Sequence, residues 1–150
     1  MKIVYTFNGP EFDQYHTQFF TAARFWELFI KDDRTLQVTV AASPSDGQGG
    51  LKASAAWNSL DGSDLPITAA IGVDIADVSK AFHFTETLIH ELGHALGVGT
   101  LWKKRKLYTE VNRKKVVFTG TNAVQALHSM PGWAGKELLV VRIKIYNFYL

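Results

Sequence analysis

The feature that most constrains the fold is a long amphipathic segment between residues 11 and 31. Residues 8–10 precede it with a turn-forming Asn-Gly-Pro sequence, and Asp32 and Asp33 end it. Apolar residues recur in it at spacings of three and four, as in a helix that buries one face: Phe12, Tyr15, Phe19, Ala22, Ala23, Trp26, Phe29 and Ile30. Because such a face must be covered, we expect the helix to pack against a sheet.

Segments on both sides of this helix have the composition of strands. Residues 2–7 and 35–42 alternate and are rich in β-branched or aromatic side chains, and residues 67–75 continue the pattern. Residues 51–60 are small and apolar and could form a further strand or irregular structure. We therefore expect an α/β (α+β) fold, in which a small twisted mixed sheet packs against the long N-terminal helix and a second helix.

The pattern weakens after Trp102. We expect a hairpin within residues 107–119, a short helix at residues 121–129, and one last strand at residues 136–150, which are rich in Val, Ile, Tyr and Phe. No internal repeat and no linker divides the chain, and its 150 residues suit a single domain that spans residues 1–150.

Composition excludes several classes of protein. Cysteine is absent, which excludes disulfides, thiolate metal sites and cysteine nucleophiles together. The net charge of +2 is too small to indicate a nucleic-acid partner, and the basic run at residues 103–106 is interpreted as a solvated loop or hairpin. No stretch reaches the ~18 apolar residues of a membrane span. Residues 1–7 lack the apolar core of a signal peptide.

The second expected helix runs from about residue 80 to residue 95 or 96. Ser79 is its expected N-terminal cap, because a serine hydroxyl can satisfy a free backbone amide of the first turn. Gly97 and Gly99 are expected to end it, since glycine adopts the left-handed conformation that closes a helix at little steric cost.

Within this helix lies the five-residue sequence His90-Glu91-Leu92-Gly93-His94. Side chains four residues apart lie on one face of a helix, with Cβ atoms roughly 5–6 Å apart, so both imidazoles can hold one zinc ion at about 2.0–2.1 Å. Glu91 is rotated by about 100° from His90 and could reach a water molecule on the open side of the metal, as general base. Bound zinc would polarise a scissile carbonyl and lower the pKa of that water to about 7.

The alternative is that this short sequence arose by chance in an ordinary core helix. Three features favour a metal site: strong helical signals around it, small or apolar residues between the ligands, and glycines directly after it. Two histidines and a glutamate would also be unfavourable as plain core residues, because each buried polar group needs a partner. We therefore predict Zn²⁺ bound by His90 and His94, with Glu91 as the catalytic residue.

Residues 90–97 resemble the start of the metzincin zinc motif, His-Glu-x-x-His-x-x-Gly-x-x-His. Gly97 matches the glycine of that motif, whereas Thr100 stands where its third histidine would be, and a neutral hydroxyl is a poor zinc ligand. Residues 90–102 are more similar to a bacterial group related to the leishmanolysin-type metalloproteases, in which a long insertion precedes the third ligand. The likeness extends from about residue 1 to about residue 128 and includes residues 65–66, 73–77 and 118–123.

This resemblance implies a secreted, metzincin-like zinc endopeptidase that acts on protein or peptide substrates. It also implies a third ligand from a His-Trp pair beyond residue 130 and then a methionine turn. No histidine follows His128, so His128 is the candidate substitute ligand, and a surface histidine at a helix end is the alternative. We therefore expect a chain truncated or altered after about residue 130. The alternative function is an inactive remnant that binds zinc weakly or not at all.

Other polar residues are expected to have structural roles. His83 is two helical turns from His90, roughly 10 Å by rise, which is too far to share the ion, and His16 lies on the first helix. Met130 follows His128 too closely to form the methionine turn. Four aspartates lack the spacing of a recognised calcium loop and are expected in turns and caps: Asp61, Asp64, Asp74 and Asp77.

Overall fold

The computed structural model describes residues 1–43, 49–78, 83–112 and 115–140. The chain forms two compact units, an N-terminal unit from Met1 to Val98 and a C-terminal unit from Gly99 onward. Each unit is described by itself below. This division does not test the single domain expected from the sequence, which stays a prediction.

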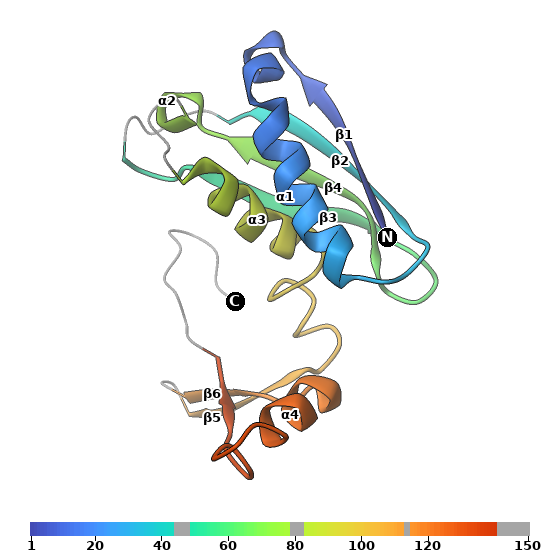
Figure 1. The fold of residues 1–150 in the computed structure, drawn as a ribbon, viewed down its shortest axis with the longest axis vertical. Coiled ribbons are helices and arrows are strands. Elements are labelled where there is room, and N and C mark those ends of the chain that lie inside the picture. The colour runs from blue at the N-terminus through green and yellow to red at the C-terminus, as the bar shows by residue number, and fades with distance from the viewer. Residues whose placement is uncertain (44–48, 79–82, 113–114, 141–150) are drawn as a thin grey trace. The chain divides into compact units, whose positions relative to one another are not determined.

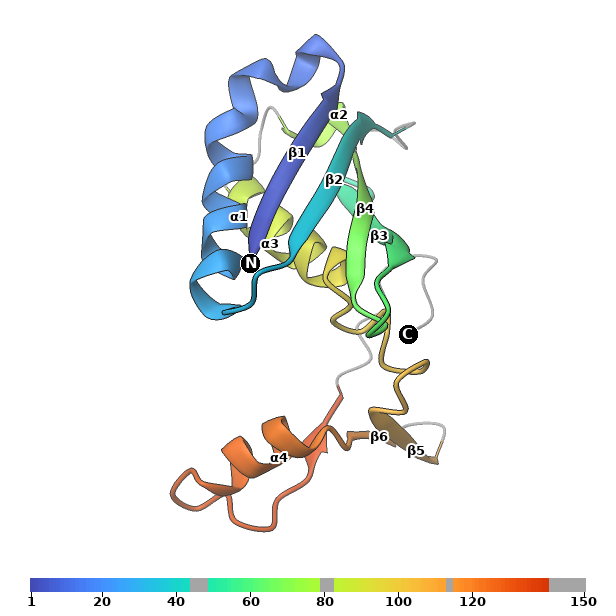
Figure 2. The same cartoon turned by 90° about the vertical axis from the view of Figure 1, so that its right-hand side faces the viewer.

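The described residues of the N-terminal unit form a four-stranded sheet with strand order β1-β2-β4-β3 (Figures 1 and 2). Its strands are β1 (Lys2–Asn8), β2 (Thr35–Ala42), β3 (Ala53–Leu60) and β4 (Pro66–Val73). The first two pairings are parallel and β3 is antiparallel to β4. The expected small mixed sheet is therefore confirmed, and the segment that could have been strand or irregular is the edge strand β3.

Two helices lie on the same side of this sheet, α1 (His16–Phe29) and α3 (Phe84–Ala95) (Figure 2). The 3-10 helix η1 (Pro10–Tyr15) leads into α1, so the helix expected from about residue 11 to about residue 31 is a 3-10 helix in its first part, and its α-helical part ends at Phe29. Pro10 is the first of the six residues of this tighter helix, and α1 ends where Ile30 adopts an extended conformation. The short helix α2 (Ile75–Val78) follows β4 after one residue, Asp74.

The described helix α3 begins at Phe84, later than the expected start near residue 80. His83 is its N-cap and makes no side-chain capping hydrogen bond, and Ser79, the expected cap, lies outside the described residues. At the other end the helix stops at Ala95, as expected from the two glycines that follow.

The core of the N-terminal unit fills the space between the helices and the sheet. The largest fully buried apolar side chains come from η1, α1, the strands and α3: Phe12, Phe19, Leu36, Ile71, Leu88 and Leu92. Phe12, Phe19, Ala22 and Ala23 confirm the apolar face expected for the first helix. Phe29 is the exception, because it is 69% exposed at the end of α1 and packs with Phe25 at a ring-centroid distance of 5.0 Å.

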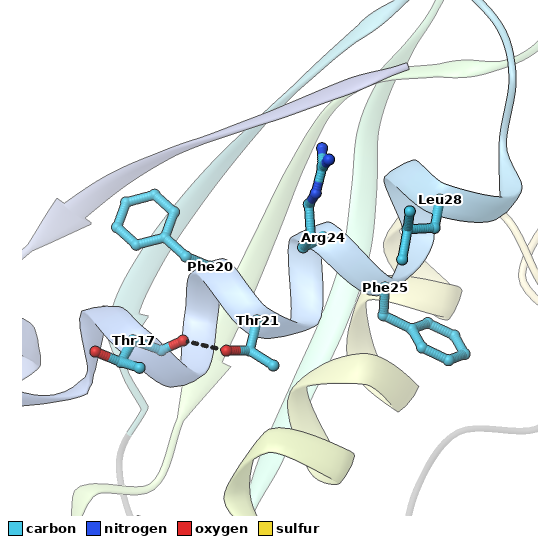
Figure 3. A pocket seen from close by; sticks show the side chains of 6 residues that line it. All are labelled: Thr17, Phe20, Thr21, Arg24, Phe25 and Leu28. Atoms are coloured by element: carbon cyan, nitrogen blue, oxygen red, sulfur yellow. Dashed lines mark hydrogen bonds between the residues drawn. The ribbon is translucent and has the colours of Figure 1, made fainter.

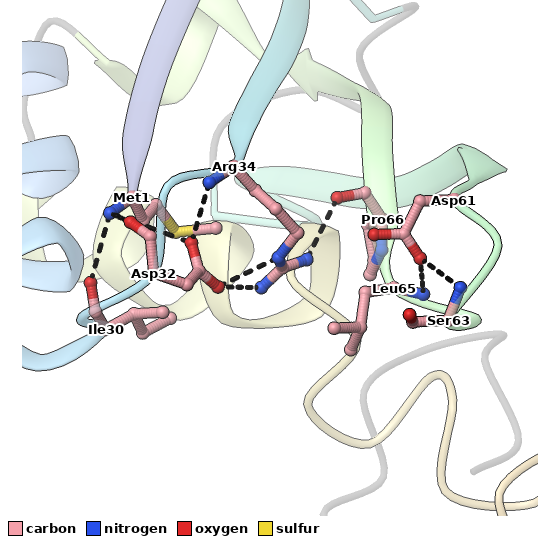
Figure 4. Close-up of polar contacts among 8 residues, drawn as sticks. All are labelled: Met1, Ile30, Asp32, Arg34, Asp61, Ser63, Leu65 and Pro66. Carbon is pink, nitrogen blue, oxygen red and sulfur yellow. Dashed lines mark hydrogen bonds and ion pairs between the residues drawn. The ribbon is translucent and has the colours of Figure 1, made fainter.

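Polar contacts close the end of the sheet at which β2 begins (Figure 4). The Arg34 guanidinium donates to Asp32 (Nε to Oδ2, 2.8 Å) and to the carbonyl of Pro66 (3.4 Å). Desolvation raises the pKa of Asp32, but hydrogen bonds and positive charge from Arg34 outweigh it and hold that pKa below its usual value. In the neighbouring turn Asp61 accepts from the backbone N–H groups of Ser63 (2.8 Å) and Leu65 (3.0 Å), which confirms the expected turn.

The C-terminal unit contains a second, smaller sheet of order β5-β6-β7 among its described residues. Its strands are β5 (Tyr108–Asn112), β6 (Lys115–Phe118) and β7 (Leu138–Leu139), and its helix is α4 (Thr121–His128). The expected hairpin and short helix are therefore confirmed. Of the last expected strand, the structure describes a two-residue strand, and residues 141–150 lie outside the described residues.

No helix in the described part of the chain is long and apolar enough to cross a membrane.

Candidate metal centre

Helix α3 holds the predicted zinc-binding residues because its apolar face fixes its rotation. Leu88, Leu92 and Ala95 are fully buried in the core of the N-terminal unit. His90 and His94 share the other face of the helix, where His90 is exposed and His94 is partly exposed. The two imidazoles are thus held by a rigid element and remain open to solvent, as a metal site requires.

Gly93 allows α3 to approach α1 closely at this point. A Cβ atom on Gly93 would lie 3.1 Å from Cζ2 of Trp26, which is tighter than ordinary van der Waals contact. Trp26 cannot move aside freely, because its indole N–H donates to the carbonyl of Ile89 at 2.8 Å. The glycine between the two histidines therefore has a packing role, in which the α1 indole fixes the backbone next to His90.

The two histidines point at one another across a single helical turn. Their Nε2 atoms are 3.0 Å apart, and their rings are perpendicular. Two nitrogen ligands at about 2.0–2.1 Å from a tetrahedral zinc ion would be about 3.3 Å apart. The observed separation is therefore within a few tenths of an ångström of that required for a shared ion, and the residues fit a zinc site.

The turn at the end of α3 fixes the orientation of His94. Gly97 has φ +98°, its N–H donates to the carbonyl of His94 (3.0 Å), and the N–H of Val98 donates to the carbonyl of Gly93 (2.9 Å). These two bonds form a Schellman motif. The motif brings the Val98 carbonyl to 2.9 Å from Nδ1 of His94. Since a carbonyl can only accept, Nδ1 carries the hydrogen and Nε2 has the lone pair. Metal-binding histidines are commonly oriented by such a hydrogen bond from the other ring nitrogen.

Glu91 lies on a different side of α3 from the histidines and is buried. Burial raises the pKa of its carboxyl to about 7, although a backbone hydrogen bond from Ala55 on β3 acts in the opposite direction. This contact ties the glutamate to the edge strand of the sheet. Partial desolvation and then the charge of His94 lower the pKa of His90, which favours the neutral imidazole that binds metals.

The three other histidines make contacts of their own. His128 ends α4 in the C-terminal unit, where its Nε2 contacts the carbonyl of Lys136 at 2.9 Å; its role as third ligand stays a prediction. His83 lies 3.5 Å from Glu86, and His16 stacks on Phe7. Within the described ranges, no group of three or more His, Cys, Asp or Glu residues could hold a metal ion.

Three groups that support the site were missed by the sequence analysis: the Trp26 indole, the Val98 carbonyl and the Ala55 backbone N–H. Gly97 and Gly99 were the available signal for the second of them, because a glycine-closed helix end turns the following carbonyl back on the helix. The positions of the Trp26 indole and the Ala55 N–H depend on which helix and which strand pack against α3. A local sequence pattern does not contain this information.

A pocket lined by residues of α1 contains none of these residues (Figure 3). It is lined by Thr17, Phe20, Thr21, Arg24, Phe25 and Leu28. Phe20 and Leu28 are more than half exposed there, and Arg24 is the charged residue of the lining. Since this lining contains no acid and no histidine, it does not form a second candidate catalytic centre.

Comparison with known proteins adds no family assignment. No protein-family model matches the chain, and no curated protein matches it.

Proposed function

We propose that this protein is a zinc-dependent endopeptidase with a zincin-like, metzincin-related fold. The observation that carries the proposal is the pair of Nε2 atoms of His90 and His94, 3.0 Å apart on one helical face. The Val98 carbonyl holds the ring of His94 in the tautomer whose Nε2 carries the lone pair. The imidazoles of His90 and His94 would serve as two zinc ligands. The third ligand that the resemblance implies is not assigned to a residue.

Glu91 would be the general base for the attack of water on a peptide carbonyl. Zinc, when bound, supplies Lewis-acid polarisation of that carbonyl and makes the attacking water more acidic. The carboxylate of Glu91 would take the proton of this water and then give it to the departing amine. Its buried position next to β3 keeps the carboxylate partly desolvated, which makes it a stronger proton acceptor than an exposed glutamate.

The edge strand β3 supports a peptide as the substrate. In the described sheet β3 pairs with β4 on one side, and strand order places it at the edge. An extended peptide can add to such an edge through backbone hydrogen bonds. Because Ala55 of β3 contacts Glu91, a peptide aligned along this edge would pass close to the proposed base.

Substitution of Glu91 tests the proposal. Glu91→Gln keeps the shape of the side chain and is expected to retain zinc while lowering cleavage of an unstructured protein substrate by about 10²–10⁴-fold. Glu86→Gln is the matched control, because Glu86 lies exposed on the same helix, and it should leave cleavage unchanged. His94→Ala should lose zinc. Metal content is measured by mass spectrometry, and cleavage with and without a chelator.

The same measurements separate the proposal from its alternative. Stoichiometric zinc with chelator-sensitive cleavage supports the endopeptidase. Undiminished cleavage in the Glu91→Gln variant would end it, and a purified chain that neither retains zinc nor cleaves protein would favour a catalytically inactive remnant.

A further inference from the structure

Two buried aspartates lie outside the proposed zinc site. Asp74 directly follows β4 and Asp77 belongs to α2. Their exposed fractions are 2% and 7%, so both side chains are more than nine-tenths buried. Charged residues are rarely this buried unless they are paired or bind a metal, and the proposed peptidase chemistry uses neither of them.

Within residues 1–43, 49–78, 83–112 and 115–140, each of these carboxylates has one oxygen with a hydrogen-bond partner and one without. Oδ1 of Asp74 accepts from the N–H of Ala76 (2.8 Å), which confirms its expected role in a cap or turn. Oδ1 of Asp77 accepts from the N–H of Gly49 (2.7 Å), which lies 28 residues earlier in the sequence. The Oδ2 atoms of both aspartates are buried, and among the described residues neither has a hydrogen-bond partner.

The two unpartnered oxygens belong to one local structure. Asp74 and Asp77 are three residues apart, and the N–H of Asp77 donates to the carbonyl of Asp74 (3.2 Å). Asp74 directly precedes α2 and Asp77 is its third residue, so both belong to the first turn of this short helix. Within the part of the chain that the structure describes, no lysine, arginine or histidine forms an ion pair with either of them.

This arrangement is unfavourable unless a positive group joins it. A buried carboxylate oxygen without a partner loses its hydration and receives nothing in return. A bound cation would remove that penalty at both side chains.

We propose that Asp74 and Asp77 bind an oxygen-preferring divalent cation of the calcium type through their Oδ2 atoms. Calcium accepts carboxylates together with backbone carbonyls and water in a flexible geometry, whereas magnesium requires a near-ideal octahedron and keeps most of its waters. The buried position and the two fixed carboxylates therefore favour calcium. Histidine nitrogens suit zinc and carboxylate oxygens suit calcium, so this site and the proposed zinc site would select different ions.

The cation would stabilise the region that precedes the zinc helix. Asp77 already connects α2 to Gly49, and the N–H of Asp74 donates to the carbonyl of Lys52, the residue before β3. An ion held by both aspartates would therefore fix the start of the edge strand against α2. Its main effect is expected on thermal stability, independently of zinc.

The experiment measures the melting temperature of the full chain, freed of metals and titrated with CaCl₂. At about 100-fold excess over the dissociation constant, the wild-type melting temperature should rise by about 5–10 °C. The rise should be lost in Asp77→Asn, whose amide oxygen can still accept from Gly49. Asp33→Asn is the matched control, since Asp33 is exposed, and it should retain the full shift. A His90→Ala/His94→Ala double variant should also retain it, which separates this site from the zinc site.

A second readout distinguishes a cation site from a purely structural aspartate. Without calcium, Asp77→Asn removes a buried negative charge and should melt at the same temperature as the wild type or higher. Asp74→Asn should behave in the same way and replaces Asp77→Asn if that variant does not fold. A wild-type melting temperature that calcium does not change overturns the proposal, as does a calcium shift that persists in both aspartate variants.

Discussion

The described residues of the two units differ in how many apolar side chains they bury. The N-terminal unit has a continuous core in which η1, α1, α3 and the strands all contribute fully buried side chains. In the described residues of the C-terminal unit, the buried apolar side chains are Leu101 and Val116, and Trp102 packs on Phe118 at a ring-centroid distance of 4.7 Å. Since buried apolar area is the main source of stability, the N-terminal unit should be the more stable of the two.

The consequence for function is that the proposed catalytic helix lies in the better-packed unit. The ligands of a metal site must be held within a fraction of an ångström, and only packed side chains can hold them. In α3 this support comes from the core on one face and from Trp26 beside Gly93.

The largest expected effect tests the comparison directly. Phe19→Ala removes a fully buried ring of the N-terminal unit and should lower the free energy of unfolding by about 3–5 kcal/mol. Val116→Ala, in the C-terminal unit, should cost about 1–2 kcal/mol, because a smaller side chain with fewer buried neighbours is removed. Denaturant titrations of both variants measure these values.

Hydrogen exchange supplies the control for this pair of variants. In the wild type the amides of β2 and β4 should exchange most slowly and those of β5 and β6 faster, since local opening follows local packing. Equal protection in the two units, or a larger loss from Val116→Ala than from Phe19→Ala, would contradict the comparison.

A medium effect is expected where α1 meets α3. Gly93→Ala places a Cβ atom against a Trp26 ring that is itself hydrogen-bonded, and we expect a destabilisation of about 1–3 kcal/mol despite the better helix propensity of alanine. Gly62→Ala is the matched control, because nothing lies within 4 Å of the added atom, and it should be close to neutral. If Gly93→Ala stabilised the chain, the helices would not be in close contact there.

The smallest effect concerns one ion pair in each unit. Asp32 pairs with Arg34 in the N-terminal unit, and Lys115 pairs with Glu137 in the C-terminal unit, where both side chains are more exposed. Asp32→Asn should lower the free energy of unfolding by about 1 kcal/mol or less at neutral pH. Glu137→Gln should lower it by a smaller amount.

The pH dependence of the first variant has a definite sign. Because the folded-state pKa of Asp32 lies below its usual value, its stabilisation is present above the unfolded-state pKa and is lost as the pH falls through the folded-state pKa. The difference between wild type and Asp32→Asn should therefore shrink from neutral pH to about pH 2. Unfolding titrations at both pH values measure it, and a difference that grew in acid would contradict the assignment.

Local periodicity predicted most elements of this fold. The apolar spacing from Phe12 to Ala23, the alternating strands and the helix around His90 all appear in the structure, because their burial patterns repeat at the period of the element itself. The exposed Phe29 was not predicted, since the apolar spacing continues to the last residue of α1 whereas the packed surface does not. Strand order and the edge position of β3 were also beyond a local pattern.

The candidate site was predictable to the same extent. The spacing of His90 and His94 is a property of one helix, so the sequence sufficed to predict their convergence. The contact of Glu91 with Ala55 and the orphaned oxygens of Asp74 and Asp77 depend on segments distant in sequence. For the two aspartates, the sequence predicted roles in caps and turns. It did not predict that the Oδ2 atom of each would be buried without a hydrogen-bond partner among the described residues.

The strand order β1-β2-β4-β3 also implies an order of assembly. β3 and β4 are joined by the short turn that Asp61 organises, so their antiparallel pairing closes a small loop and should form early. β2 and β4 are neighbours in the sheet, but in the sequence the whole of β3 lies between them. β1 can pair with β2 only once α1, which connects them, has packed on the sheet. Until then β4 has one unpaired edge, and a newly synthesised chain is at its most prone to aggregate during that interval.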